Sequence, residues 1–326
     1  MKKLVKGIKA FIALFLFIII SSLIYYKGSI LLVFDIYKEL KDSNKSIETL
    51  GNLINYKASS SMEVKYLKYK NTASKEVFLD LYLSNNYNKP SPVIIYVHGG
   101  SWIYGDNSIP IGLEPIINAF NNRGFTIISL SYELLDSRNI DLKDPIIDVK
   151  DAIRWVYKNK DKYNFNTNDI GLLGISSGAQ LSLMAAYTDD ESFIGDKDLS
   201  NYSSKVNYVI DIFGPTELST LDFSDISLNN KKIKNLINSK DELDNYSPIN
   251  YISDESPKTL IVHSIEDEIV PYSNSEDLYN SLLSNNIDTN LITLKQGSHF
   301  FTDFNLNEVY IAIIKVLKFL TSSTSL

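Results

Sequence analysis

The chain has 326 residues, a hydrophobic fraction of 44% and a formal net charge of −7. This length and apolar content suffice for one large domain or two small ones with a sizeable core. The acidic balance argues against a nucleic-acid-binding surface, and the lack of cysteine excludes disulfides, thiolate nucleophiles and cysteine-based metal sites.

The N-terminal segment predicts a membrane anchor. An uncharged apolar run over residues 10–26 follows four lysines, Lys2, Lys3, Lys6 and Lys9. At 1.5 Å per residue the run covers about 25 Å, which can span a bilayer when the last lysine extends toward the interface. The positive-inside rule keeps the lysines in the cytoplasm and exports the remainder, so we expect a single-pass cell-membrane protein with an extracytoplasmic main domain. The alternative is secretion after signal cleavage, for which Ile20-Ser21-Ser22 is a poor site.

Three regions follow from the sequence. Residues 1–28 contain the lysines and the anchor or signal peptide, and residues 29–61 are expected to form an amphipathic helical stalk, because their apolar residues recur at helical spacing. Residues 62–326 then form the main domain. Its first segments, residues 62–69 and 77–83, alternate apolar and polar residues as two antiparallel strands should.

The rest of the domain alternates apolar strands with helices. Residues 92–97 form a short, wholly apolar run that is typical of a strand buried on both faces. Further strands are expected at 125–130, 170–174, 206–213, 259–263 and 290–294, with helices at 110–122, 145–160, 177–187, 274–283 and 308–320. This alternation predicts an α/β fold with a mainly parallel, eight-stranded sheet flanked by helices. Such sheets place their chemistry at the carboxyl ends of the strands.

The segment Gly174-Ile175-Ser176-Ser177-Gly178 lies between an apolar strand and a helical pattern. A Gly-x-Ser-x-Gly turn of this kind places its serine at the apex of a strand-turn-helix unit, and the flanking glycines let the helix pack against the strand. The turn lifts the Ser176 hydroxyl clear of the sheet and points the Ser177 N–H toward the same space. Because the motif also occurs by chance, it identifies a nucleophile only together with other segments.

A nucleophilic serine needs an imidazole to take its proton and a carboxylate to orient that imidazole. The chain contains three histidines. His98 precedes a glycine loop and His263 lies inside or at the edge of an apolar strand, whereas His299 lies in a polar turn after the last expected strand. We therefore predict that His299 is the base.

Three carboxylates follow the strand expected at residues 259–263, namely Glu266, Asp267 and Glu268. Such a cluster is usually a solvated loop. However, the chain order serine, acid, histidine belongs to one fold, and the acid of that fold follows the penultimate strand. We choose Asp267 as the acid, with Glu266 and Glu268 as lesser candidates.

Together these segments resemble the α/β-hydrolases, and specifically the carboxylesterases of the hormone-sensitive-lipase and feruloyl-esterase-like groups, over roughly residues 62–320. The matching pieces are His98-Gly99-Gly100-Ser101-Trp102 with Gly105-Asp106, Asp148 with Ala152 and Trp155, the glycine-flanked serine turn, Phe213-Gly214-Pro215-Thr216, Ser247-Pro248, Asp267 with Val270-Pro271, and His299-Phe300. The resemblance implies an oxyanion hole built from the N–H groups of Gly100, Ser101 and Ser177. It also implies that His98 shapes this loop and is not a second base.

Several positions depart from the family's pattern. Ser101 stands where the loop usually has its third glycine, so it keeps an N–H but adds a Cβ that is expected to narrow the acyl site. Ser264 and Ala179 replace glycines with other small residues. Glu133 stands where these families commonly have an arginine, and the sequence does not show which residue pairs with Glu133. Trp102 is assigned to substrate binding as a wall of the site, although an indole on an apolar loop is a little more often a plug in the core.

These features predict a serine esterase that forms an acyl-enzyme on Ser176. The segment between residues 213 and 258 is mostly polar, which favours a short acyl group, most simply acetyl, on a small or carbohydrate-like alcohol. No cofactor or metal is expected, because the sequence has neither a close pair of histidines nor a phosphate loop. The alternatives are a serine peptidase of the prolyl-oligopeptidase type and a non-catalytic hydrolase-like binding protein. The oligomeric state is left open.

Overall fold

The computed structural model describes residues 64–72, 76–84, 89–109, 117, 120–121, 123–135, 140–223, 239–300, 303 and 305–324. The predicted anchor and stalk, residues 1–61, lie outside this part of the chain, as does most of the helix expected at 110–122. Among the residues described, no helix combines the length and the apolar character needed to cross a membrane.

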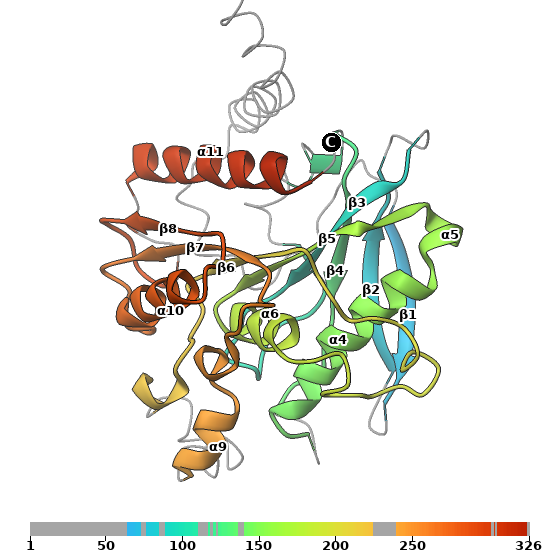
Figure 1. Cartoon of the computed structure of the whole chain (residues 1–326), viewed down its shortest axis with the longest axis horizontal. Coiled ribbons are helices and arrows are strands. Elements are labelled where there is room, and N and C mark those ends of the chain that lie inside the picture. The colour runs from blue at the N-terminus through green and yellow to red at the C-terminus, as the bar shows by residue number, and fades with distance from the viewer. Residues whose placement is uncertain are drawn as a thin grey trace, which may run out of the picture.

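A single eight-stranded sheet forms the centre of the described domain (Figure 1), with the order β1-β2-β4-β3-β5-β6-β7-β8. Its strands are β1 (Val64–Asn71), β2 (Glu76–Tyr82), β3 (Ser91–Val97), β4 (Thr126–Leu130), β5 (Phe165–Ile175), β6 (Tyr208–Ile212), β7 (Lys258–Ser264) and β8 (Thr289–Leu294). β2 pairs antiparallel with both β1 and β4, and all other pairs are parallel. The predicted mainly parallel sheet is confirmed.

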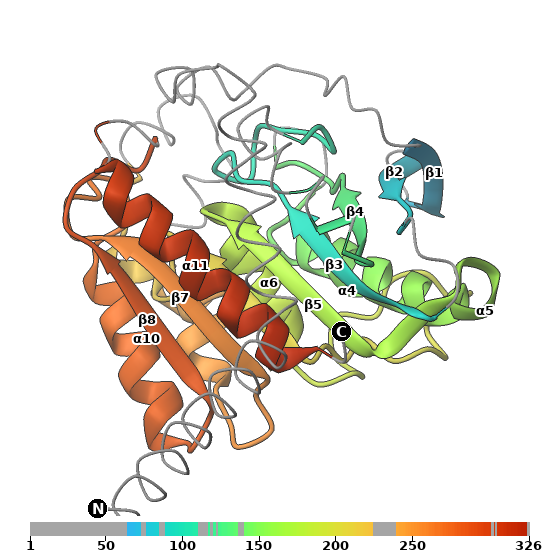
Figure 2. The same ribbon diagram turned by 90° about the horizontal axis from the view of Figure 1, so that it is seen from above.

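Helices cover both faces of this sheet. They are α4 (Lys143–Lys158), α5 (Lys160–Tyr163), α6 (Ser177–Tyr187), α9 (Lys240–Asn245), α10 (Ser273–Ser284) and α11 (Leu306–Ser323), with short 3₁₀ turns η3 (Leu218–Thr220) and η4 (Pro248–Tyr251). α11 lies across one face over β7 and β8, and α4, α6 and α10 lie on the other (Figures 1 and 2). β5 begins five residues before the predicted strand. Apart from Phe165, its first residues are polar and show no apolar pattern, so the sequence did not indicate this part of the strand.

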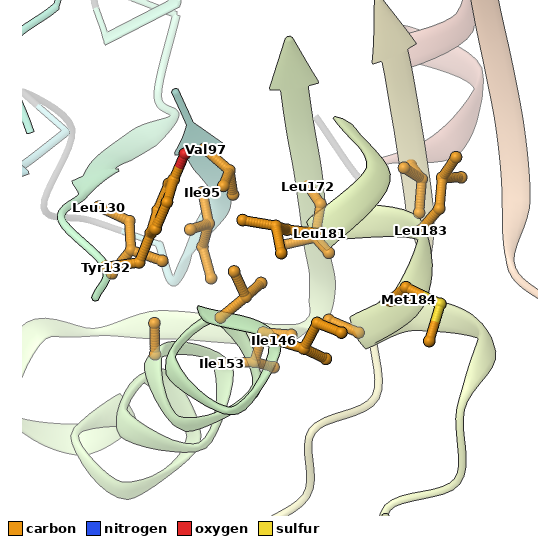
Figure 3. Close-up of a cluster of buried hydrophobic side chains, with 14 of the residues drawn as sticks. Ile95, Val97, Leu130, Tyr132, Ile146, Ile153, Leu172, Leu181, Leu183 and Met184 are labelled. Carbon is orange, nitrogen blue, oxygen red and sulfur yellow. The ribbon is translucent and has the colours of Figure 1, made fainter. Parts of the chain in front are cut away.

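Two apolar clusters fill the space between the sheet and its helices. All seven residues of β3 are buried, and residues 93–97 alternate between the two clusters. Ile95 and Val97 pack toward α4 and α6, where they meet Ile146 and Leu181 (Figure 3). Ile94 belongs to the cluster under α11. Both faces of β3 are covered, which suits its apolar residues after Ser91, and each such side chain contributes about 2 kcal/mol to folding.

A buried ionic cluster joins the edge strand β1 to α4. Lys70 Nζ lies 2.7 Å from Asp148 Oδ1 and 2.8 Å from Asp151 Oδ2, and Arg154 Nη1 lies 2.8 Å from Asp151 Oδ1. Burial raises the pKa of Asp148 from 3.8 to about 6, although the charge of Lys70 acts in the opposite direction. The cluster therefore holds β1 against the helix at an electrostatic cost that its pairing only partly offsets.

Glu133, where the resembled families have an arginine, lies beside this cluster. Its side chain accepts a hydrogen bond from Thr72 Oγ1 at 2.7 Å, and its backbone N–H donates to Asp148 Oδ2 at 2.6 Å. The positive charge next to Asp148 thus comes from Lys70 on β1, and the acidic side chain at position 133 is bound by the end of the same strand.

Candidate active site

The turn between β5 and α6 holds Ser176 in a strained backbone conformation, with φ 54° and ψ −124°. A positive φ is costly for a residue with a side chain, and it is the geometry of a sharp strand-to-helix turn. A Cβ at Gly174 would lie 2.4 Å from Ala179 Cα, and a Cβ at Gly178 would lie 2.3 Å from the carbonyl oxygen of Val97. Both flanking positions therefore require glycine.

The structure brings together the three side chains predicted to form a triad. Ser176 Oγ lies 2.8 Å from His299 Nε2, and His299 Nδ1 lies 2.7 Å from Asp267 Oδ2. The residues follow the carboxyl ends of β5, β7 and β8, which share one edge of the sheet. With the Nδ1–H donated to the carboxylate, Nε2 is available to accept the proton of the Ser176 hydroxyl.

The carboxylate of Asp267 is buried and well supplied with donors. Its Oδ1 accepts the backbone N–H groups of Ile269 at 2.9 Å and Val270 at 2.8 Å. Burial alone would raise the pKa of Asp267, but hydrogen bonds from His263 and His299 and the Val270 N–H hold it well below its ordinary value. The group therefore stays ionised over the range in which a histidine can act as a base.

The loop after β3 lies against the serine turn. A Cβ at Gly99 would lie 2.9 Å from the carbonyl oxygen of Ile175 and 3.3 Å from Ser176 Cβ. The next residues, Gly100 and Ser101, have φ values of 126° and 52°. The N–H groups of Ile103 and Tyr104 close the loop by donating to the carbonyl of Gly100 at 3.0 and 2.9 Å.

Ser177 is the first residue of α6, so its N–H has no acceptor within the helix. It follows Ser176 directly in the chain. The three N–H groups predicted to form an oxyanion hole therefore belong to two segments that meet at the nucleophile. Their action as donors stays a prediction.

His98 packs against the loop that follows β3. Its ring stacks on Tyr132 with 4.1 Å between centroids, and its Nδ1 lies 2.8 Å from the carbonyl oxygen of Gly99. Tyr132 donates its hydroxyl to the carbonyl of His98 at 2.9 Å. A Cβ at Gly105 would lie only 2.3 Å from His98 Nδ1. These contacts are those of a residue that shapes the loop.

Comparisons to known proteins agree with the fold. The BD-FAE family model matches residues 79–282. The chain belongs to the BD-FAE family. Esterase LipC of Mycobacterium tuberculosis is 27% identical over 193 residues, which are 56% of this chain and 46% of that protein. The chain spans about half the length of the curated relatives it matches.

Solved structures show the same fold. A truncated form of a carbohydrate esterase from gut microbiota superimposes with a TM-score of 0.65 at 24% identity, covering 82% of this chain and 100% of that one. A propionate-bound esterase, Est2 of Thermogutta terrifontis, superimposes with a TM-score of 0.64 at 21% identity, covering 80% and 92%.

The assignment of Trp102 to substrate binding needs correction. In this BD-FAE domain the indole is 2% exposed and its N–H donates to Gln180 Oε1 at 2.8 Å, with the ring of Phe223 6.4 Å away. Of the two alternatives, the structure therefore favours the second, in which Trp102 fills a space in the core. Gln180, which sequence reasoning missed, also donates to the carbonyl of Tyr246 at 2.8 Å. It thus connects the loop after β3, the first turns of α6 and the residue that follows α9.

Both lesser acid candidates contact the backbone near His299. Glu268 Oε2 accepts the N–H of His299 at 3.1 Å, and Glu266 Oε2 accepts the N–H of Gly297 at 3.3 Å. Neither is the carboxylate at His299 Nδ1, where the structure places Asp267. Sequence reasoning also missed His263, whose Nε2 lies 3.2 Å from Asp267 Oδ2. The only signal for it was a position four residues before the acid.

Proposed function

We propose that this BD-FAE protein is a serine esterase that hydrolyses short-chain acyl esters through an acyl-enzyme on Ser176. The proposal rests on the continuous hydrogen-bonded path from Ser176 Oγ through the His299 ring to Asp267 Oδ2. Relatives named as esterases or carboxylic ester hydrolases, 23–27% identical to this chain, support the same reaction class.

In the proposed reaction, His299 Nε2 takes the hydroxyl proton as Ser176 Oγ attacks the ester carbonyl carbon. The carbonyl oxygen becomes an oxyanion that faces the N–H groups of Gly100, Ser101 and Ser177, where one donor can lower the barrier by about 3 kcal/mol. The protonated His299 gives its proton to the alcohol as the C–O bond breaks. Water that is deprotonated by His299 then attacks the acyl-enzyme, releases the carboxylic acid and restores the Ser176 hydroxyl.

We propose an acetyl-type acyl group on a small or carbohydrate-like alcohol. Ser101, with φ 52°, adds a Cβ beside the oxyanion loop where glycine would leave room. The sequence between residues 213 and 258 is mostly polar and offers little apolar surface for a long chain. The propionate found in Est2 and the name of the gut carbohydrate esterase, both of the same fold, favour a small acid and a carbohydrate alcohol.

The purified full chain tests this with p-nitrophenyl acetate, butyrate and decanoate, acetylated sugars and aminopeptide substrates, alongside Ser176→Ala. We expect kcat/KM for acetate or butyrate to exceed that for decanoate at least about tenfold, because a site without an apolar groove gains little from each added methylene. A preference for decanoate would overturn the proposed short acyl group, and faster peptide cleavage would indicate a peptidase.

A fluorophosphonate probe gives a second test. It should label the wild type and not Ser176→Ala. A folded wild type that stays unlabelled would indicate a binding protein.

We also propose, from the sequence alone, that residues 10–26 anchor the protein in the cell membrane with the catalytic domain outside. The full chain should then sediment with membranes, and protease added to intact cells should remove the domain. A shortened soluble form with a new N-terminus near Leu23 would show cleavage of a signal peptide instead.

A further inference from the structure

Two histidines share the carboxylate of Asp267. Its Oδ2 lies 2.7 Å from His299 Nδ1 and 3.2 Å from His263 Nε2. Each ring has a serine at its other nitrogen, since Ser176 Oγ lies 2.8 Å from His299 Nε2 and Ser275 Oγ lies 2.6 Å from His263 Nδ1. A second serine–histidine pair therefore mirrors the first across the acid.

The contacts of His263 determine where its proton lies. The ring is fully buried on β7, and Nε2 faces two oxygen acceptors, Asp267 Oδ2 and the carbonyl of Val270 at 3.1 Å. Two acceptors at Nε2 require a proton on that nitrogen, so in the neutral ring Nδ1 accepts the hydroxyl proton of Ser275. Ser275, in the first turn of α10, thus supplies the donor for the nitrogen that carries no proton in this tautomer.

The shared carboxylate has donors on both oxygens. Oδ1 accepts two backbone N–H groups, from Ile269 and Val270. Oδ2 accepts from His299 and lies 3.2 Å from His263 Nε2, whose single N–H is shared with the carbonyl of Val270. The side chain of Asp267 is completely buried, so water does not replace a missing donor. Removal of His263 would leave His299 as the only donor that the described residues provide to Oδ2.

We infer that His263 is a positioning residue that holds the Asp267 carboxylate in place and draws part of its charge away from His299. The inference rests on the proposed function and deepens it. A carboxylate that already accepts a proton from His263 stabilises protonated His299 less strongly. His263 should therefore reduce the stabilisation that Asp267 gives to the protonated ring of His299, because both rings contact the same carboxylate oxygen.

Other groups face the two rings from neighbouring elements. The carboxylates of Glu266 and Glu268 bind the backbone of the loop that carries His299. The ring of Tyr272 packs edge to face on His263 at 5.7 Å, and its hydroxyl hydrogen-bonds Thr293 Oγ1. The Phe213 ring lies 5.5 Å from His263 and 6.0 Å from His299. None of these groups changes in the variants at positions 263 and 275.

Three variants of the full chain separate positioning from packing. His263→Leu removes the donor, His263→Gln can place an amide N–H at the position of Nε2, and Ser275→Ala removes the hydroxyl that donates to Nδ1. We expect His263→Leu to lower kcat about tenfold to a hundredfold with KM nearly unchanged, and to move the acidic limb of the kcat/KM profile up by about half to one pH unit. His263→Gln should restore most of both, and Ser275→Ala should move the limb the same way by a few tenths of a unit.

Histidine NMR gives a readout that needs no substrate. Because the chain has three histidines, a selectively labelled sample gives three ring signals that substitutions can assign, and the pKa of His299 can be followed directly. We expect it to rise in His263→Leu. Tyr272→Phe is the matched control, since it keeps the ring beside His263 and should move neither the limb nor the NMR titration.

The outcomes are distinct. If His263→Leu lowers kcat and Tm but shifts neither titration, and His263→Gln does not restore activity, His263 is only a packing residue and the inference is wrong. If His263→Leu does not fold, an unshifted titration in Ser275→Ala overturns the inference. A wild type that hydrolyses none of the esters refutes the proposed function, whereas the NMR titration still decides whether His263 acts on His299.

Discussion

Asp211 is a fully buried carboxyl on β6, paired in the sheet with Gly174 just before the Ser176 turn. Its Oδ1 accepts the N–H of Gly214 at 2.8 Å, and its Oδ2 has no hydrogen-bond partner within the part of the chain that the structure describes. Burial raises the pKa of Asp211 from 3.8 to about 7, and the hydrogen bond from Gly214 offsets only part of that effect.

The folded state therefore binds this proton more tightly than the unfolded state. The stabilisation is fully present below the ordinary pKa of 3.8 and is lost as the pH rises through about 7. Between pH 5 and pH 8 we expect this group to remove about 2–3 kcal/mol from the free energy of unfolding. Asp211→Asn keeps an acceptor for Gly214 and cannot ionise, so it should gain that amount relative to wild type over the same interval.

Urea unfolding at pH 5, 6, 7 and 8 measures the free energy of unfolding for both chains. Other carboxyls such as Asp148 titrate in both, so the difference between the two chains isolates position 211. Asp277→Asn, an exposed carboxylate on α10, is the control and should show no such trend. A difference between wild type and Asp211→Asn that stays constant from pH 5 to pH 8 would refute the argument, because it would mean that the buried carboxyl is not protonated preferentially in the fold.

Five other substitutions test the site and its support. Ser176→Ala and His299→Ala should each lower turnover in ester assays at least about a thousandfold, and Asp267→Asn should lower it somewhat less. The circular dichroism spectrum should stay unchanged in all three variants. Near-normal rates for Asp267→Asn would show that another carboxylate is the acid. Lys70→Met leaves two buried carboxylates on α4 without their lysine and should lower the free energy of unfolding by about 3–5 kcal/mol in urea, so a loss below about 1 kcal/mol would contradict the buried pairing. Gln180→Leu removes the acceptor of the Trp102 indole N–H, next to the loop of Gly100 and Ser101, and should lower kcat about tenfold in the same ester assays. An unchanged kcat would mean that this hydrogen bond is not needed to hold the loop in place.

The three residues of the proposed triad could be predicted because each follows a strand of one parallel sheet. The carboxyl ends of such strands share an edge, so Ser176, Asp267 and His299 converge although 123 residues separate the first from the last. The two glycines of the serine turn were predictable for a similar reason, since the turn leaves no room for a Cβ at either position.

Other features depend on partners that the sequence does not pair. His263 has the pattern of a buried strand residue, and only the path of the following loop turns Asp267 back toward its ring. For Trp102, an aromatic residue on an apolar loop suits a core plug only a little better than a pocket wall, so the sequence does not decide between them. The deciding contact is the side chain of Gln180, 78 residues away, which satisfies the indole N–H inside the core. Long-range side-chain pairs of this kind become visible only in three dimensions.

The position of Lys70 affects how this domain could be excised or recombined. The segment that matches the BD-FAE family, residues 79–282, excludes both Lys70 and His299. A fragment trimmed to those limits would retain the acidic residues of α4 without the lysine that neutralises them, and Ser176 without its base. Lys70 and Asp148 form a buried ion pair although they lie in separate segments of the chain. A chimera of two related proteins should therefore take both residues from the same parent sequence. The smallest transplantable module of this protein thus begins no later than β1 and extends at least through His299.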